Sequence, residues 1–256
     1  KLIPPGKDDI EGQLGLTMPA VFALLARRQM HESGATPEDF AQVSVKNHHH
    51  GCLNPYAQYK KEFTIEEVLA SRMICEPITL LQCCPNTDGS AAVILCSMDF
   101  ARKHTTNPVK IAGSALLSAG YSWQQKDITS SPLGVETARR AYEMAGCGPE
   151  DIDLVELHDA FSTEEILRYE DLGLCKPGEG VAFLRSGAPA LGGKVPVNPS
   201  GGLLSLGHPL SASGVRVVAE VTTHLRGQAG KRQVEGAKVG LAHMLGGFAA
   251  GLEAGA

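Results

Sequence analysis

From residue 108 to the end of the chain, strand-like apolar segments alternate with segments of helical periodicity. VKIAGSALLS and DLVELHD have the continuous apolar character of buried strands, whereas PLGVETARRAYEMAG and STEEILRYEDLG are amphipathic. Gly146 and Gly173 follow the two helical segments, and Ser162 with Glu165 forms a capping-box pattern at the start of the second. This order predicts a layered α/β domain whose sheet is covered on both faces.

The remainder of this half is less regular. Residues 174–200 are rich in Gly and Pro and predict a looser connection. GHPLSASGVRVVAEVTTHLRG predicts a helix that begins at a glycine-rich turn, and KVGLAHMLGGFAAGLEAG predicts two apolar strands around glycines. The α/β pattern therefore continues to the end of the chain.

The first hundred residues do not show this alternation of strands and helices. Apolar spacing predicts a helix over about 17–33, and Thr36-Pro37-Glu38-Asp39 is a helix start whose helix ends near Gly51. Thr64 and Glu67 form a second capping box. PITLLQCCPNTDGSAAVILCS predicts two buried strands around a turn at residues 86–89. We expect a helical insert followed by the closing hairpin of another sheet.

Composition narrows the class of protein. The 256 residues allow one large or two ordinary domains, and a net charge of −5 does not favour nucleic acid or an acidic membrane surface as a partner. Seven cysteines without framework spacing indicate reduced thiols in a cytoplasmic compartment. No apolar run reaches the roughly 18 residues of a membrane span, and no signal peptide is recognised. Because the sequence begins at Lys1, we expect the native N-terminus to be processed or to lie outside it.

Three histidines lie where strands or helices are expected to end. His208 follows Gly201, Gly202 and Gly207 at a helix start, where free N–H groups suit an oxyanion or phosphate, so it is a candidate base or hydrogen-bond donor. The alternative is a solvated histidine in a tight turn. His158 follows a buried strand, at the edge where open α/β sheets place their sites; alternatively, it only orients a turn.

His243 lies in a late apolar strand, shortly before Gly246 and Gly247. Those glycines would let backbone N–H groups approach a ligand closely, although a core histidine bonded to the backbone explains the pattern equally. His48–His50 would point in different directions on a helix and lack partners at metal-ligand spacing, so we expect a structural or surface role. Cys83 and Cys84 are too close for a CxxC site; we expect core thiols, one of which could face a site.

Taken together, the histidine-bearing motifs resemble a known family. ELHDAFSTEEILRYEDLGLCKPGEG, VNPSGGLLSLGHPLSASG and RGQAGKRQVEGAKVGLAHMLGG are similar to the C-terminal half of thiolases, specifically the sterol-carrier-protein-x type and its bacterial lipid-transfer-protein relatives. KNHHHGCLNPYAQYKKEFTIEEVLASRM and LLQCCPNTDGSAAVIL are similar to the middle region of the same group. The resemblance runs in order from about residue 10 to the end.

The resemblance implies a layered thiolase fold of duplicated βαβαβαββ halves. Residues 1–77 would be a loop domain over an acyl-CoA site, residues 78–104 the end of the first half, and residues 105–256 the C-terminal half. The family's nucleophilic cysteine belongs to the beginning of the first half, so none of the cysteines here is assigned that role.

The resemblance also implies roles for single residues. His208 would activate the nucleophile and help to hold the thioester oxygen, and His158 would polarise the same oxygen. Gly246 and Gly247 would form a second oxyanion hole, and Cys84 would lie near the CoA. The family's second thiol is missing from both of its known places, where this chain has Ala160 and His243-Met244-Leu245. Ser211 replaces a glycine that is usual after GHPL, which would narrow the pocket.

Two chemistries therefore stay open. The first is a thiolase-like acyltransferase that makes or breaks a carbon–carbon bond next to a CoA thioester in fatty acyl or sterol side-chain metabolism, with His243 or a residue outside this sequence as the further acid/base. The second is an aldolase-type lyase that cleaves a β-hydroxyacyl-CoA without an acyl-enzyme, as bacterial relatives do with a small OB-fold partner subunit. A non-catalytic acyl-CoA or lipid-binding protein is a third possibility. The resemblance implies a homodimer, CoA thioesters as substrates, no further cofactor and no metal.

Overall fold

The computed structural model describes residues 13, 15–118, 128–249 and 252–255. Residues 1–12 and 14, which belong to the predicted loop domain, lie outside these ranges. Within them, no helix is both long enough and apolar enough to cross a membrane.

The two predicted N-terminal helices are confirmed. They are α2 (Met18–Ser33) and α3 (Pro37–Cys52). The start of α3 is the predicted one: the Asp39 carboxylate accepts the Thr36 backbone N–H at 2.7 Å, because the first turn of a helix leaves N–H groups without helical partners. The capping box of α4 (Ile65–Ala70) is confirmed as well, since Thr64 and Glu67 each accept the other's backbone N–H.

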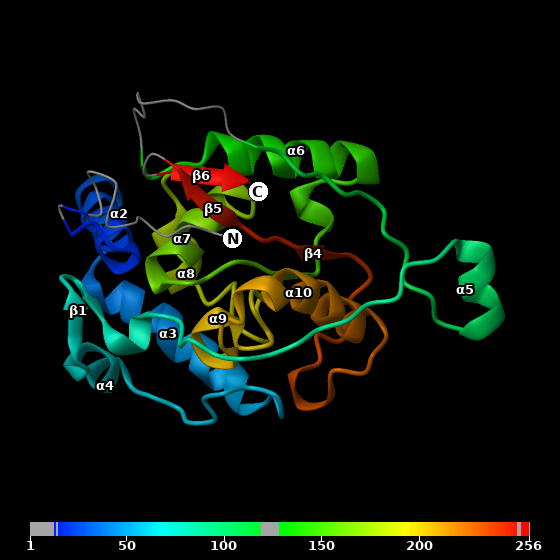
Figure 1. Cartoon of the computed structure of the whole chain (residues 1–256), viewed down its shortest axis with the longest axis horizontal. Helices are drawn as coiled ribbons and strands as arrows, with labels where there is room; N and C mark the ends of the chain where they lie inside the picture. Colours follow the sequence, from blue (N-terminus) through cyan, green and yellow to red (C-terminus); the bar gives the residue numbers. More distant parts are fainter. Residues whose placement is uncertain (1–12, 14, 119–127, 250–251, 256) are drawn as a thin grey trace.

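The predicted buried hairpin after α4 is wrong. Strands β1 (Met73–Cys75) and β2 (Ile78–Thr79) pair antiparallel, and a 3-10 turn, η1 (Leu80–Gln82), follows. Beyond it the chain runs without regular structure as far as α5 (Met98–His104), which stands at the end of a projecting arm (Figure 1).

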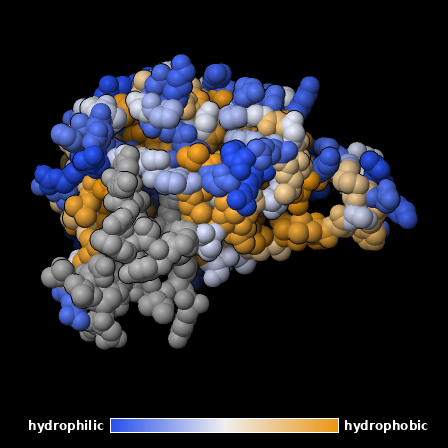
Figure 2. All heavy atoms as spheres, turned by 90° about the horizontal axis from the view of Figure 1, so that it is seen from above, coloured by the Kyte–Doolittle hydropathy of each residue, from blue (hydrophilic) through white to orange (hydrophobic). Residues whose placement is uncertain are grey.

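The predicted strand VKIAGSALLS is wrong too, because residues 109–118 return from α5 without pairing to any strand that the structure describes. Apolar side chains along the arm are consequently exposed: Ile94 by 90%, Leu95 by 70% and Leu116 by 85%. Apolar side chains are also visible on the flank that leads to the projecting part (Figure 2). A strand needs a neighbouring backbone for its hydrogen bonds, and none is supplied to this arm by the described residues.

The helices predicted in the C-terminal part are confirmed, with shorter strands between them. The elements are α6 (Pro132–Ala145), η2 (Pro149–Asp151), β3 (Leu154–Glu156), α7 (Ser162–Asp171), α8 (Gly180–Arg185), α9 (Gly202–Leu206), α10 (Leu210–Leu225), η3 (Gly230–Arg232), β4 (Gly240–Ala242), β5 (Gly246–Ala249) and β6 (Leu252–Gly255).

Strand β3 is the centre of this part. It pairs in parallel with β4, and Val155 bridges to Val197 on its other side. Helix α10 packs against β3 and β4, and Figure 1 shows α10 close to β4. Leu154 and Val155 are fully buried, so β3 is part of the hydrophobic core. The final strands β5 and β6 form a separate antiparallel pair.

The predicted capping box at Ser162 and Glu165 is wrong. Helix α7 begins after Phe161, and the Ser162 hydroxyl is buried without a hydrogen-bond partner among the described residues. Glu165 instead pairs with Lys46 of α3 at 2.9 Å, and both side chains are buried. The two residues belong to a buried group that we call the Lys46 cluster, which comprises Lys46, Asn47, Asp159, Glu165, Tyr169 and Asn198.

Candidate active site

His158 stands in the turn that connects β3 to α7. The next residue, Asp159, anchors this turn: its carboxylate accepts the Leu203 N–H of α9 at 2.6 Å and the Asn47 amide of α3 at 2.8 Å. Gly202 makes this contact possible, because a Cβ on it would stand 2.1 Å from the Asp159 carboxylate and its φ is +59°. Burial and the nearby Glu165 raise the pKa of Asp159 well above its usual value. The Lys46 cluster thereby fixes the loop that carries His158.

His208 stands in the turn between α9 and α10. The turn lies against the extended segment before the arm, since the His208 N–H donates to the Pro85 carbonyl at 3.3 Å. Gly207 has φ +103°, and a Cβ there would lie 2.5 Å from the Thr87 methyl group. The sequence therefore needs glycine at this point to bring His208 up to residues 85–89.

The tautomer of His208 follows from its partner. Its Nδ1 lies 2.8 Å from the Ser213 hydroxyl oxygen, and that hydroxyl donates its own proton to the Pro209 carbonyl. On this basis we assign Nδ1 as the donor to Ser213, which leaves the lone pair on Nε2. Burial, with the neighbouring His158 and Arg216, lowers the pKa of His208 to about 4. With this pKa His208 is neutral at pH 7, which suits the predicted role of a base better than that of a hydrogen-bond donor to oxygen through Nε2.

The two predicted histidines come together. The rings of His158 and His208 meet edge to face with their centroids 5.2 Å apart. The two histidines have different hydrogen-bond partners. His158 Nδ1 lies 2.9 Å from a carboxylate oxygen of Glu164, and both side chains are buried. Two histidines with unlike partners at one point are suited to acid and base roles.

His243 follows β4, where its N–H donates to the Glu156 carbonyl at 2.8 Å and extends the parallel ladder. Its ring is buried, and neither ring nitrogen has a hydrogen-bond partner in the described ranges. Burial, with the charges of Arg168 and His158, lowers the pKa of His243 well below its usual value. His243 is therefore a buried core residue, but its ring does not bond the backbone as the alternative expected, and it lies within electrostatic reach of His158.

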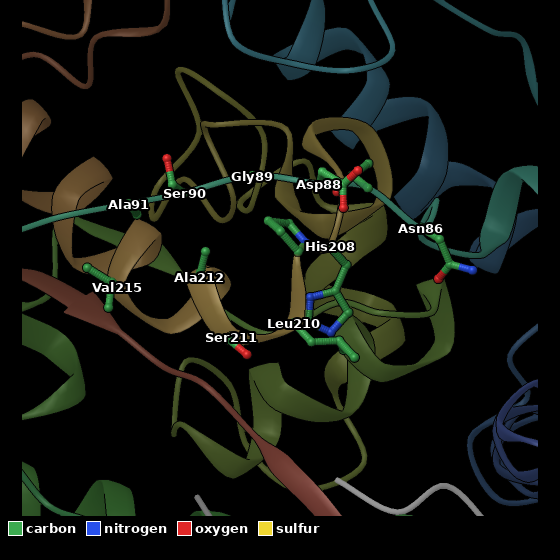
Figure 3. Close-up of a pocket in the computed structure, with 12 residues that line it drawn as sticks. Asn86, Asp88, Gly89, Ser90, Ala91, His208, Leu210, Ser211, Ala212 and Val215 are labelled. Atoms are coloured by element: carbon green, nitrogen blue, oxygen red, sulfur yellow. The ribbon is translucent and has the colours of Figure 1, made fainter. Parts of the chain in front are cut away.

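A pocket of about 590 Å³ opens beside His208. Figure 3 shows the extended segment that forms one wall, which crosses the start of α10. Its lining comes from two stretches, residues 86–91 and residues 208–212, with Val215 one turn further along the helix. The predicted turn at residues 86–89 is thus a pocket wall instead of a hairpin end. The sequence did not predict this lining role, because the run Asn86-Thr87-Asp88-Gly89 indicates only a turn.

Cys84 lies next to Ala160, the position where the resemblance expects the family's second thiol. Its backbone N–H donates to the Ala160 carbonyl at 2.8 Å, and Cys83 bridges to Phe161. Burial is the main cause that raises the pKa of the Cys84 thiol to about 12, with Asp159, Cys83 and Glu164 adding to it. Cys84 is therefore a protonated thiol near the His158 turn, and the pocket lining begins two residues later.

The remaining predicted residues lie apart from the pocket lining. Gly246 and Gly247 open β5, where Gly246 pairs with Gly255 of β6. Of the three adjacent histidines, His49 is exposed and pairs with Glu62, while His48 and His50 are buried. His50 accepts the Leu191 N–H at Nε2 and bonds the Asn198 carbonyl through Nδ1, so its role is structural, as predicted. Within the described ranges no group of side chains could hold a metal ion.

These features define a class of protein: an α/β domain with paired histidines at the carboxyl end of a parallel strand. A family model described as "Thiolase C-terminal domain-like" matches residues 115–252, which is more than half of the chain. The chain belongs to this family.

Curated relatives are similar along most of the chain. The chain is 48% identical to the acetyl-CoA acetyltransferase of Methanothermobacter thermautotrophicus over 93% of its own length and 62% of the relative. It is 46% identical to the benzoylsuccinyl-CoA thiolase subunit BbsB of Thauera aromatica, over 93% of the chain and 63% of the relative. It is 45% identical to sterol carrier protein 2 of Bos taurus, over 89% of the chain and 43% of the relative. The chain thus spans less than two thirds of the length of these relatives.

Solved structures agree with the fold. The Ltp2-ChsH2(DUF35) aldolase matches with a TM-score of 0.83 and 31% identity, over 95% of this chain and 63% of that one. The acetyl-CoA acetyltransferase of Bacillus anthracis matches with a TM-score of 0.63 and 19% identity, over 87% of this chain and 56% of that one, which supports the fold alone. An acyltransferase and an aldolase therefore share the architecture of this chain.

Proposed function

We propose that this protein is a thiolase-like acyltransferase that makes or breaks a carbon–carbon bond next to a CoA thioester in lipid metabolism. The observation that carries the proposal is the meeting of His158 and His208, 5.2 Å apart, beside a pocket of about 590 Å³. Three relatives at 45–48% identity, named as an acetyltransferase, a thiolase subunit and a sterol carrier protein, support the same class.

In thiolytic cleavage, the nucleophilic thiolate adds to the 3-keto carbon of a 3-ketoacyl-CoA. The Cα–Cβ bond then breaks, its electron pair passes into the thioester enolate, and Cα takes up a proton. A second CoA finally releases the acyl group. The neutral Nε2 of His208 suits the step that removes the thiol proton. An N–H at Nε2 of His158 would stabilise the enolate oxygen.

A second candidate is an aldolase-type lyase. The aldolase structure with a TM-score of 0.83 favours it, and so does Ala160, which stands where the resemblance expects a second thiol. Here His208 would take the hydroxyl proton of a β-hydroxyacyl-CoA, the Cα–Cβ bond would break, and the enolate would be protonated at Cα. The products would be an aldehyde or ketone and a shortened acyl-CoA, and no acyl-enzyme would form.

One assay separates the candidates. The full-length protein is given a 3-ketoacyl-CoA with free CoA, and separately a β-hydroxyacyl-CoA without CoA, and products are followed by mass spectrometry. We expect CoA-dependent formation of two acyl-CoA products from the first substrate. Release of an aldehyde or ketone from the second substrate alone selects the lyase. Tight acyl-CoA binding without either reaction selects a binding protein and overturns the proposal.

Assembly is part of the same proposal. One relative is named as a subunit, and the aldolase structure names two components. We propose that this protein also works in an assembly, either as a homodimer or with a small OB-fold subunit, and that it needs no cofactor beyond the CoA thioester. Size-exclusion chromatography with light scattering, run on the protein alone and again with a small OB-fold subunit added, would show a single-chain mass in both runs if this part is wrong.

A further inference from the structure

Helix α10 carries an arginine that the proposed mechanism does not use. The Arg216 Nη1–H donates to the Gly207 carbonyl at 3.0 Å, so the guanidinium contacts the residue directly before His208. Its other two nitrogens, Nε and Nη2, are buried and make no hydrogen bond to any residue that the structure describes. Buried donors without partners cost free energy, so a contribution to stability does not by itself explain this side chain.

The contact with Gly207 fixes the peptide group that leads into His208. The φ of Gly207 is +103°, and its N–H donates to the Leu203 carbonyl of α9 at 3.1 Å. The next peptide group is planar, with the Gly207 carbonyl at one end and the His208 N–H at the other. Arg216 holds the carbonyl, and the N–H donates to Pro85 at 3.3 Å. Both ends of the plane are therefore bonded, and its orientation sets the direction in which the His208 side chain leaves the backbone.

Arg216 also acts on the turn of the second histidine through its charge. The carboxylates within its electrostatic reach are those of Glu156, Asp159 and Glu220. Asp159 follows His158 directly and anchors that turn to α9. A guanidinium stays charged in proteins, so this buried cation offsets the Asp159 carboxylate while it bonds the turn of His208. One side chain thus bears on the turns of both histidines.

The same charge acts on the His208 ring. A positive charge nearby disfavours a second one, and after burial and His158 it is Arg216 that helps to hold the pKa of His208 at about 4. The other groups that face the ring are the neutral Ser213 hydroxyl, bonded to Nδ1, and Glu164, whose charge acts in the opposite direction. Arg216 therefore affects both the orientation of His208 and its titration.

We propose that Arg216 is a positioning residue of the site, which fixes the peptide group before His208 and supplies the buried positive charge shared by the two histidine turns. It does not belong to the pocket lining that the described residues form, so it acts through His208 and not on the substrate. The effect on turnover rests on the proposed function, whereas the effect on the His208 ring does not.

Arg216→Met tests the proposal, and Arg232→Met is the matched control. Among the described residues, the hydrogen bonds of Arg232 go to the Glu220 carboxylate and the Ala229 carbonyl, and none reaches the His208 turn. Arg232→Met should therefore lower the thermal unfolding midpoint at least as much as Arg216→Met. In turnover by the full-length protein, Arg216→Met should lower kcat about 10- to 100-fold with KM within about threefold, and Arg232→Met should keep kcat within about threefold.

The His208 ring can be followed without turnover. Nitrogen-15 NMR of the full-length protein, labelled at histidine, gives the titration of the ring, and a His208→Gln variant assigns its signal. Loss of the charge in Arg216→Met should raise the pKa of His208, so that the ratio of charged to neutral His208 at pH 5 rises at least about threefold. Arg216→Lys keeps the charge but has a shorter reach to Gly207. It should leave this ratio within about twofold and lower kcat by at least about threefold.

Equal losses of kcat in Arg216→Met and Arg232→Met would overturn the proposal, and an unchanged His208 titration in Arg216→Met would do so as well. If Arg216→Met does not fold, Arg216→Lys decides, because a kcat that stays within about threefold of the wild type would show that the bond to Gly207 does not position His208. The expected change in the His208 titration, in a protein that turns over neither CoA thioester, would support this inference and reject the proposed function.

Discussion

Replacement of Lys46 by Met tests how strongly the buried polar cluster holds α3 to α7. The Lys46 ammonium lies 2.9 Å from Glu165 Oε1, and the two side chains are 4% and 0% exposed. Removal of one partner from such a pair costs about 3–5 kcal/mol, because the charge that remains is buried without compensation. The Val197 carbonyl, 2.8 Å from Nζ, loses its donor at the same time.

The measurement is urea unfolding followed by circular dichroism. With an m-value of about 3 kcal/mol per molar urea, the midpoint should fall by roughly 1–2 M. Lys46→Met combined with Glu165→Gln should recover more than half of the lost free energy of unfolding, because the Glu165 carboxylate no longer leaves a buried charge without a partner. The control is Lys61→Met, whose partner Glu67 is exposed, with an expected change below about 1 kcal/mol. A loss below about 1 kcal/mol in Lys46→Met, or no recovery in the double variant, would refute the reasoning.

Three further predictions concern the site and its supports. Gly207→Ala should lower stability by about 1–3 kcal/mol and reduce turnover, because φ is +103° and Thr87 stands 2.5 Å from the new Cβ; Gly227→Ala, with open space around it, should leave turnover unchanged. Burial lowers the pKa of His48 to about 4, so its contribution to stability is present above about pH 6.5 and is lost as the pH falls toward 4. In urea titrations over that range, His48→Leu should reduce the slope of stability against pH by up to about 1.4 kcal/mol per pH unit. Ala160→Cys introduces a thiol beside Cys84. If the site is thiolase-like, NMR should then show deuterium exchange at the α-carbon of acyl-CoA. No gain in exchange would contradict the thiolase-like function and fit the lyase.

The helices could be predicted because their signals are local. Thr36 and Asp39 cap α3, and Gly146 ends α6 with φ +68°, as their sequence positions indicate. The strands could not be predicted in the same way. VKIAGSALLS has the composition of a buried strand, but a strand forms only where a neighbouring backbone is present, and the described residues provide none there. The capping box predicted at Ser162 and Glu165 is absent for a related reason. The Glu165 carboxylate instead accepts the Asn47 amide and pairs with Lys46, both from a distant part of the chain.

The candidate site could be predicted only in part. His158 and His208 were identified from their positions at a strand end and a helix start, and the structure brings their rings together. Glu164 was missed because its contact depends on how the turn after β3 folds the start of α7 back toward His158. Residues 86–91 were missed because an extended pocket wall has the same apolar and turn residues as a hairpin. Spacing along the chain identifies such side chains as polar or apolar, and only the tertiary contacts show what they face.

We propose that the paired histidines hold a CoA thioester. A crystal structure of the full-length protein with a bound acyl-CoA tests it most directly. We predict that the thioester carbonyl oxygen lies within about 3.5 Å of Nε2 of His158, with the acyl-CoA extending along residues 86–91. A thioester bound elsewhere, with its oxygen in contact with neither His158 nor His208, would contradict the account.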